Sequence, residues 1–547
     1  GIKTQGEAAA RRRLPRGVPS TRRSPAGPQP ALQVVFRFLV PLFGPGNPDV
    51  PHPFIGSHMP DPHRTPQLTS SRPANPGTAG RSRATASRRP HPFLSATAAV
   101  LAAGHFALAP IPAAAQGRSL SIVRDAETEQ LLRDYTAPIF RAAGLSSTNP
   151  EIILNNDDSF NAFVATPRRM FVNTGVFERS ATPNEVIGVL AHETGHMAGG
   201  HLIRLRDAIA RAQVMAALAT VAGVGAMAAG AATNSSSTGS AGAAIIGGGM
   251  GAAQRSLFSY QRTEELTADR AALTYLSRTK QSAKGLLKSL SDIADQQLFS
   301  SRYADPYAQS HPIARDRIAQ LEESAKKSPY WNATDSPSLQ HRHDMVRAKL
   351  MAFTKHPNRV LRAYPPSDKS QPAQYARAII AYRTGKPRQA QQVIDSLIRT
   401  EPSNPYFWEL KGQAWIESGN PRQAIEPLRK SVSLAPSPGL MRIMLGQALV
   451  AANDPALLGE AIQQLELGLK AEPDSGLGYR QLAIAYARRG DIGLADVATA
   501  RAMMMQGQFA EAKRYASRAQ AKLKRGTPGW LQADDILAYS PPNMRGR

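Results

Sequence analysis

Two short motifs in this chain contain residue types that bind metal ions and move protons: His192-Glu-Thr-Gly-His196 and Glu265-Leu-Thr-Ala-Asp269. In a helix, residues four positions apart share a face, so His192 and His196 can bind the same metal ion. Glu193 lies about 100° around that helix, where it can accept a proton from a water that the metal activates. The pattern H-E-x-x-H, with these roles, is typical of zinc peptidases.

The second motif supplies a further metal ligand and a carboxylate that can support a ligand histidine. Glu265 would be the third protein ligand, which leaves the fourth position open to water, as in catalytic zinc sites. Asp269 follows one helical turn later and is predicted to hydrogen-bond the outer nitrogen of a ligand histidine. The chain has no cysteine, so thiolate ligands and a cysteine nucleophile are excluded. We therefore predict one Zn²⁺ per chain, bound by His192, His196 and Glu265.

A third histidine, His201, stands close to the first motif. The longer pattern H-E-x-x-H-x-x-G-x-x-H requires a histidine at position 202, where this chain has Leu202. In an uninterrupted helix, position 201 also points away from the ligand face. We predict that His201 is not a metal ligand.

The segments around the motifs must position them. Thr182-Pro-Asn-Glu185 is a capping box with proline at the first helical position, so a helix is predicted to begin there. Val186, Val189 and Leu190 give this helix a buried face. A second helix is predicted over residues 125–143.

Residues 161–166 and 169–174 read as two strands around a turn that contains Pro167. A strand beside the metal-binding helix could pair its free edge with an extended peptide and hold the scissile bond over the metal. A purely structural hairpin is the alternative.

No residue between Arg211 and Arg255 is charged. An Ala/Val/Met-rich part, a polar break at residues 234–240 and a Gly-rich part follow one another. Three interpretations remain open: a mobile, membrane-touching or substrate-gating loop, a buried helical hairpin, and a membrane-spanning hairpin.

The N-terminal part predicts export. Residues 1–89 are rich in Pro, Arg, Ser and Gly, and we expect either disorder or an extension that precedes the true start, for which Met59 is a candidate. Residues 90–115 are predicted to be a signal peptide: an arginine pair precedes an apolar stretch and the small-residue site Ala113-Ala-Ala115.

A 34-residue period begins near Gln371 and fits the positions of tetratricopeptide repeats, with Trp408, Gly412, Gly419 and Ala424 in one unit. The predicted fold class is α+β, mostly α: a zincin-like metallopeptidase domain of helices and a small sheet, followed by an α-solenoid. The predicted boundaries are residues 116–330 for the peptidase domain, 331–370 for a helical linker, 371–525 for the repeats and 526–547 for a C-terminal tail.

The formal net charge of +25 does not indicate nucleic-acid binding. Much of the excess lies in the first 115 residues, and the remainder lacks a basic run interleaved with aromatic residues. A solvated basic surface that faces anionic lipid is the preferred interpretation, so peripheral membrane contact is expected and a nucleic-acid partner is not.

Further motifs carry a family resemblance. Phe171-Val-Asn-Thr-Gly175, Val189-Leu-Ala-His-Glu-Thr-Gly-His196, Glu265 with Asp269, and His311-Pro312 with Arg317-Ile318 resemble the family of the CAAX prenyl protease and the membrane protease HtpX. The resemblance implies zinc on the three predicted ligands and Glu193 as general base. It also implies that His311 lies near the zinc and could cap it at rest, and that Arg317 faces the substrate or the developing oxyanion.

The export signal and the repeats extend what this resemblance implies. They imply a periplasmic metalloendopeptidase that degrades misfolded or stalled outer-membrane proteins and assists barrel assembly. The repeats would engage these substrates or the barrel-assembly machinery. The alternative is a periplasmic chaperone or adaptor whose peptidase site is latent and gated. The turn Thr166-Pro-Arg-Arg169 departs from the glycine pair of many relatives, which bears on the edge strand and not on the zinc.

Overall fold

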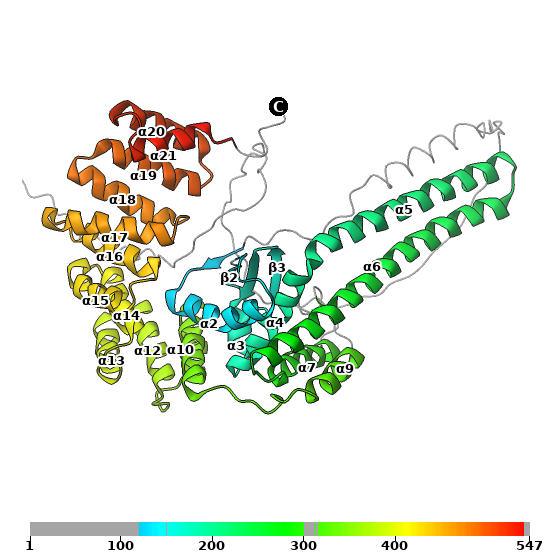
Figure 1. Ribbon diagram of the computed structural model, residues 1–547, viewed down its shortest axis with the longest axis horizontal. Coiled ribbons are helices and arrows are strands. Elements are labelled where there is room, and N and C mark those ends of the chain that lie inside the picture. The colour runs from blue at the N-terminus through cyan, green and yellow to red at the C-terminus, as the bar shows by residue number, and fades with distance from the viewer. Residues whose placement is uncertain (1–119, 149, 300–310, 312–314, 541–547) are drawn as a thin grey trace, which may run out of the picture. The chain divides into compact units, whose positions relative to one another are not determined.

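The computed structural model describes residues 120–148, 150–299, 311 and 315–540 (Figure 1). The predicted N-terminal extension, residues 1–89, and the predicted signal peptide, residues 90–115, lie outside the described residues. The same holds for residues 541–547 of the predicted tail.

A small mixed sheet lies beside the motif helix. Its strands, in the order β1-β2-β4-β3, are β1 (Ile122–Val123), β2 (Glu151–Asn155), β4 (Arg169–Asn173) and β3 (Ala162–Thr166). β3 and β4 pair antiparallel, which confirms the two strands predicted around Pro167, whereas β2 and its parallel pairing with β4 were not predicted. β3 is the outer strand on this side of the sheet and packs against the motif helix.

The peptidase part is completed by helices that surround the motif helix: α2 (Ala126–Ala142), α3 (Thr174–Arg179), α4 (Pro183–Gly199), α7 (Lys284–Phe299) and α9 (Arg315–Lys326). α4 carries the first motif and begins at the predicted proline. Its capping box differs from the prediction, because the Thr182 hydroxyl donates to the Glu185 carboxylate and caps no backbone N–H. Val186, Val189 and Leu190 are buried, as predicted, in a core shared with α2, β4 and α7.

The uncharged segment forms most of a long antiparallel hairpin of α5 (His201–Ala232) and α6 (Ser236–Arg278), whose arms lie side by side in Figure 1. The expectation of a loop is therefore wrong, because alanine-rich sequence continues the helices through this segment. The expectation of a buried hairpin is also wrong, since Leu218 and Val221 are 66% and 72% exposed. Within the described residues, α5 is the one helix that is long and apolar enough to cross a membrane.

The predicted linker is helical, and the repeats follow it as stacked helix pairs. Their helices are α10 (Pro337–Thr354), α11 (Pro357–Ala363), α12 (Gln371–Arg383), α13 (Pro387–Thr400), α14 (Pro405–Glu417), α15 (Pro421–Leu434), α16 (Gly439–Ala451), α17 (Leu458–Ala471), α18 (Gly476–Arg489), α19 (Ile492–Met505), α20 (Phe509–Lys522) and α21 (Pro528–Ala538). A short 3-10 helix, η1 (Pro455–Leu457), takes up the extra residues of one unit. Gly385 and Gly419 have positive φ at the turns inside their pairs, which explains their 34-residue spacing. The region predicted as a tail contains α21, which packs on α19 and α20.

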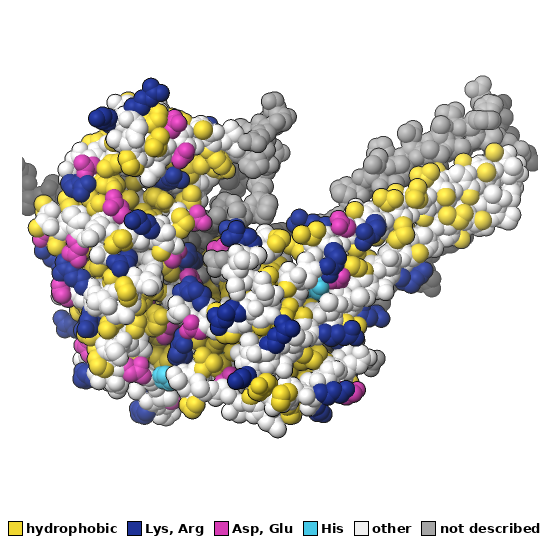
Figure 2. All heavy atoms as spheres, viewed as in Figure 1, with side chains coloured by type: hydrophobic (Ala, Val, Ile, Leu, Met, Phe, Trp, Pro, Cys, Tyr) yellow, Lys and Arg dark blue, Asp and Glu magenta, His cyan; other side chains and the backbone are white. Residues whose placement is uncertain are grey.

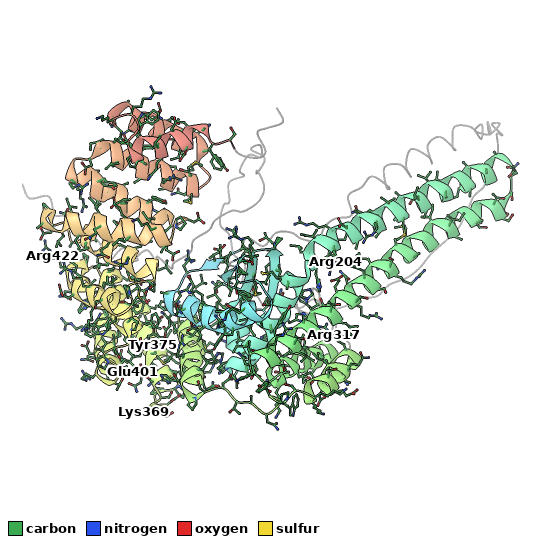
Figure 3. All side chains as sticks on the ribbon, in the orientation of Figure 1. Arg204, Arg317, Lys369, Tyr375, Glu401 and Arg422 are labelled. Carbon is green, nitrogen blue, oxygen red and sulfur yellow. The ribbon has the colours of Figure 1, made fainter. Side chains whose placement is uncertain are left out.

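A buried charged cluster joins α2 to the first repeats. Lys349 on α10 is 4% exposed, and its Nζ lies 2.5 Å from Oδ2 of Asp125 and 3.2 Å from Oε2 of Glu127. Tyr375 on α12, labelled in Figure 3, donates its hydroxyl to Glu127 over 2.9 Å, and Glu409 on α14 lies nearby. Burial opposes the charge of Lys349, yet these carboxylates raise its pKa well above the usual value. One cation thus lies among acidic groups of α2 and α14 and the capping residue Asp125.

We expect Lys349→Met to lower the free energy of unfolding by about 3–5 kcal/mol, because it leaves buried carboxylates without a cation. Urea denaturation followed by circular dichroism measures the change. Lys327→Met is the control, since Lys327 is exposed and pairs with Glu323 one turn earlier; its effect should stay below about 1 kcal/mol. Equally small effects of the two substitutions would contradict a stabilising role of this cluster.

Candidate active site

A glycine in the first motif, Gly195, brings the two motifs together. A Cβ atom at Gly195 would lie 2.8 Å from the carbonyl oxygen of Ala268 on α6, so a larger residue would push α6 away. Ala268 lies between Glu265 and Asp269, and the close approach places these two carboxylates opposite His192. α4 then ends at Gly200, whose φ of 66° is the left-handed conformation that favours glycine.

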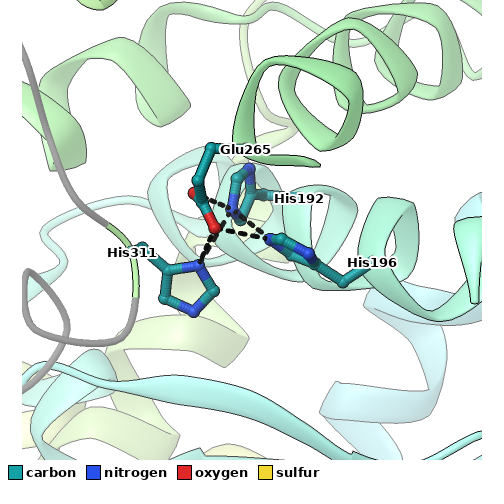
Figure 4. Close-up of side chains that lie close together, drawn as sticks. All are labelled: His192, His196, Glu265 and His311. Carbon is teal, nitrogen blue, oxygen red and sulfur yellow. Dashed lines mark hydrogen bonds and ion pairs between the residues drawn. The ribbon is translucent and has the colours of Figure 1, made fainter. Parts of the chain in front are cut away.

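Four side chains meet at this contact: His192 and His196 from α4, Glu265 from α6, and His311 (Figure 4). Nε2 of His192 lies 3.0 Å from Nε2 of His196 and 3.4 Å from Oε2 of Glu265, and Nε2 of His196 lies 3.3 Å from Oε1 of Glu265. Nδ1 of His311 lies 3.4 Å from Nε2 of His192 and 3.0 Å from Oε1 of Glu265. The structure thus brings the three predicted ligands together and adds His311 to them.

These separations fit a zinc ion. Zinc at about 2.0–2.2 Å from four tetrahedral ligands holds neighbouring ligand atoms about 3.3–3.6 Å apart, close to the observed distances. Three imidazole nitrogens and one carboxylate oxygen are a donor set that zinc favours. All four donor atoms lie within 4.8 Å of one another, so this geometry requires little rearrangement to hold the ion.

The electrostatics of the cluster couple metal binding to proton release. Burial disfavours a charge on His192, yet hydrogen bonds and charges of Asp269 and Glu265 raise its pKa to about 10. For His196 burial prevails and lowers the pKa to about 3. Burial also acts against ionisation of Glu265, but the histidines around it keep its pKa well below the usual value. Because a metal binds the deprotonated imidazole, zinc must displace a proton from His192.

Asp269 lies where the sequence predicted, behind a ligand histidine. Its Oδ1 is 2.9 Å from Nδ1 of His192, the ring nitrogen that faces away from the cluster. Burial acts against its charge, but hydrogen bonds from Arg317 and His192 lower the pKa of Asp269 to about 2. A carboxylate in this position fixes the orientation of the imidazole and makes it a better donor to a metal.

Arg317 lies against the site from α9. Its guanidinium is buried and forms two hydrogen bonds to Asp269, of 2.5 and 2.9 Å, while Nη1 lies 3.1 Å from Oε2 of Glu265. The side chain therefore holds two carboxylates of the site in place. The sequence could not show this pairing, because 48 residues separate Arg317 from Asp269.

His201 is a site residue that the sequence analysis missed. It begins α5, after the chain turns at Gly200, so the assumption of one uninterrupted helix was wrong. Its Nδ1 lies 2.8 Å from Nδ1 of His196, and its Nε2 lies 2.7 Å from Oε2 of Glu264 on α6. His201 is not among the grouped ligand atoms, in line with the prediction, but it supports His196 as Asp269 supports His192. The glycine pair Gly199-Gly200 was the available signal for the break.

Glu193 lies beside the cluster without joining it. Its carboxylate is fully buried, and Oε1 lies 3.5 Å from Nε2 of His311. Among the residues that the structure describes, none donates a hydrogen bond to either oxygen of Glu193. Burial raises the pKa of this carboxyl above its usual value. A buried carboxylate with spare acceptor capacity, next to a group of metal ligands, can accept a proton from a water molecule.

The matches to known protein families divide the chain as the structure does, into a peptidase part and repeats. Residues 125–325 match peptidase family M48, and residues 375–439 match the tetratricopeptide repeat. The chain therefore carries an M48 metallopeptidase domain followed by tetratricopeptide repeats. This confirms the predicted fold class and the family resemblance.

Several known proteins are similar to this chain in sequence or in structure. A Yersinia pestis protein named beta-barrel assembly-enhancing protease is 24% identical over 392 residues, which are 68% of this chain and 75% of that protein. The Escherichia coli (strain K12) protein of the same name is 22% identical over 301 residues, 53% of this chain and 59% of that protein. Among solved structures, YrrB, described as a TPR protein with an unusual peptide-binding site, is 17% identical with a TM-score of 0.27, over 33% of this chain and 91% of YrrB.

We expect His201→Ala to weaken zinc affinity by about 10–100-fold, because His196 loses the partner that fixes its ring. Competition with a chromophoric chelator measures the affinity of the purified chain. His341→Ala is the matched control, since His341 is partly exposed on α10 and pairs with Glu401 away from the site. Unchanged affinity in His201→Ala would show that the contact does not support the ligand.

Proposed function

We propose that the chain is a zinc-dependent metalloendopeptidase. The observation that carries the proposal is the set of donor atoms from His192, His196 and Glu265 at tetrahedral spacing, with Glu193 buried beside them. A purely structural zinc site would need no adjacent buried carboxylate with spare acceptor capacity. The M48 match supports the same class of reaction.

When bound, zinc would polarise the scissile carbonyl and lower the pKa of the attacking water. Glu193 would accept the proton of that water and then deliver it to the nitrogen of the leaving amine. Its raised pKa favours this exchange, because a carboxyl that ionises closer to neutral pH can both take and return a proton. Asp269 and Arg317 would hold His192 and Glu265 in place.

The outer strand β3 is the proposed binding site for the substrate backbone. Among the described residues, β3 pairs with β4 alone, so its other edge can accept an extended peptide. β3 also packs against α4, the helix that carries Glu193. A peptide that added to this edge would run alongside the metal-binding helix, which supports cleavage within a chain.

The proposed substrates are misfolded or stalled outer-membrane proteins in the periplasm. The name shared by the Yersinia and Escherichia relatives supports this assignment, as do the repeats, which stack into a solenoid of the kind that binds protein segments. The repeats would engage these substrates or the barrel-assembly machinery. The predicted signal peptide, residues 90–115, would direct export.

A second function, a chaperone or adaptor with a latent peptidase site, is favoured by the position of His311. Its Nδ1 stands at ligand distance from two donor atoms, and its Nε2 lies near Glu193. His311 would thus occupy the position that water and substrate need. Proteolysis would begin when His311 leaves, and the repeats could act on client proteins without it.

We expect Glu193→Gln to keep about one zinc per chain and to abolish cleavage of casein, because the amide keeps the shape of the side chain but accepts no proton. Metal analysis and initial cleavage rates of the same samples measure both properties.

Glu322→Gln on α9 is the control for this substitution, since Glu322 is partly exposed and pairs with Lys326 within its own helix. Full activity of Glu193→Gln would remove Glu193 from the reaction. Loss of zinc together with activity would indicate a structural role instead.

We expect His311→Ala to raise basal casein cleavage at least severalfold, because it vacates the position beside His192 and Glu265. Rates are compared at equal zinc content, so that altered metal affinity does not enter the comparison. Unchanged or lost activity would contradict a capping role for His311.

A further inference from the structure

The hairpin of α5 and α6 does not take part in the chemistry along most of its length, and its composition is unusual for a surface element. Between Arg211 and Arg255 it contains no charged residue. We propose that this hairpin inserts into the apolar core of a lipid bilayer, an interaction that goes beyond proteolysis and is independent of it.

Small residues form much of the contact between the two arms, and Ile246 and Met227 pack against two of the glycines. From residue 209 to residue 254 the buried positions are Gly223, Gly230, Gly242 and Ala253. A Cβ atom at Gly223 would lie 2.5 Å from the carbonyl oxygen of Gly242, and one at Gly230 would lie 2.5 Å from the backbone of Gly239. Such close backbone approach through glycine and alanine is how helices pack in membranes, where apolar burial provides no driving force.

Large apolar side chains point outward from the same arms. Val214, Leu218 and Val221 form a stripe on α5 and are 59%, 66% and 72% exposed, and Ile245 and Met250 are exposed on α6. Figure 2 shows this apolar surface along the hairpin. A water-soluble hairpin has the opposite arrangement, with its large apolar residues between the helices and polar residues outside. The distribution of side chains therefore fits a lipid environment and not water.

The length of the uncharged arms matches a bilayer. Residues 212–232 of α5 extend about 31 Å, and residues 236–254 of α6 extend about 28 Å, at 1.5 Å per residue. The hydrocarbon core of a bilayer is about 30 Å thick. The turn between the arms, Thr233 to Ser235, and the first residues of α6, up to Ser240, are polar but carry no charge, so they can reach the opposite headgroup layer.

Exposed arginines surround the base of the hairpin, where the arms join the peptidase part: Arg204, Arg206, Arg211, Arg255 and Arg262. Figure 3 shows Arg204 at the start of α5. Acidic residues in the same stretches are fewer, and Glu264 is paired with Arg204 and His201. A cationic collar next to an apolar rod of bilayer length is suited to anionic lipid headgroups.

The first test is flotation of the full chain with vesicles of phosphatidylcholine and phosphatidylglycerol. The double variant Leu218→Asp/Val221→Asp should lower the ratio of bound to free protein by at least about tenfold, because two carboxylates enter the hydrocarbon. Both positions are exposed, so folding in water should not suffer, and casein cleavage verifies this. Leu531→Asp, at an exposed leucine of α21, is the control and should bind as wild type.

Equal binding of wild type and the double variant would overturn the proposal, because another segment would then be responsible. A second result would also overturn the proposal: the wild-type protein does not bind vesicles but self-associates, and the double variant does not self-associate. The apolar surface would then contact a second copy of the chain.

The second test locates the hairpin directly. The chain has no cysteine, so Leu218→Cys can be labelled alone with an environment-sensitive NBD dye. On vesicles its emission should shift to the blue and be quenched by doxyl groups on the lipid chains, whereas the same dye at Leu531→Cys should show neither effect. A dye at position 218 that remains in water while the protein floats with the vesicles would refute insertion. Neither test depends on catalysis, so its outcome is separate from that of the proposed peptidase activity.

Discussion

The close contact of α4 with α6 at Gly195 is the constraint on which the site depends. The glycine lets the backbone of Ala268 on α6 approach α4. Glu265, a ligand, and Asp269, a supporting carboxylate, lie on the same stretch of α6 and so come close to His192. Arg317 holds both carboxylates from a third helix, α9. Any larger residue at position 195 would push α6 away from α4 and separate the ligands. The geometry of the metal site therefore depends on this helix packing.

The parts of the site that lie within one helix could be predicted from the sequence. Four-residue spacing fixed the relation of His192 to His196 and of Glu265 to Asp269, because both pairs lie on single helices. The contacts of Arg317 could not be predicted, since they join residues 48 positions apart through the packing of α9 on α6. His201 was missed because a left-handed residue, Gly200, ends α4 and redirects the chain.

The fold, like the site, could be predicted where it is built from segments that are close in the sequence. Periodicity identified the repeats and the β3–β4 pair, which are built from neighbouring segments. It did not identify β2, whose parallel pairing with β4 depends on a crossover, and it did not decide between a loop and a helical hairpin for the uncharged segment. Helices α5 and α6 contribute both to the site and to the apolar surface of the hairpin. At the base, α5 and α6 contribute His201, Glu264 and Glu265 to the site, and beyond Arg211 and Arg255 they carry the apolar surface proposed to enter lipid.

Zinc K-edge X-ray absorption of the purified full chain tests the central claim most directly, because it reports the metal, its ligands and their number together. The account predicts about one zinc per chain, with a first coordination shell of imidazole nitrogens from His192, His196 and His311 and carboxylate oxygen from Glu265. A chain that binds no stoichiometric zinc, or zinc whose spectrum shows fewer than two imidazole ligands, would contradict it.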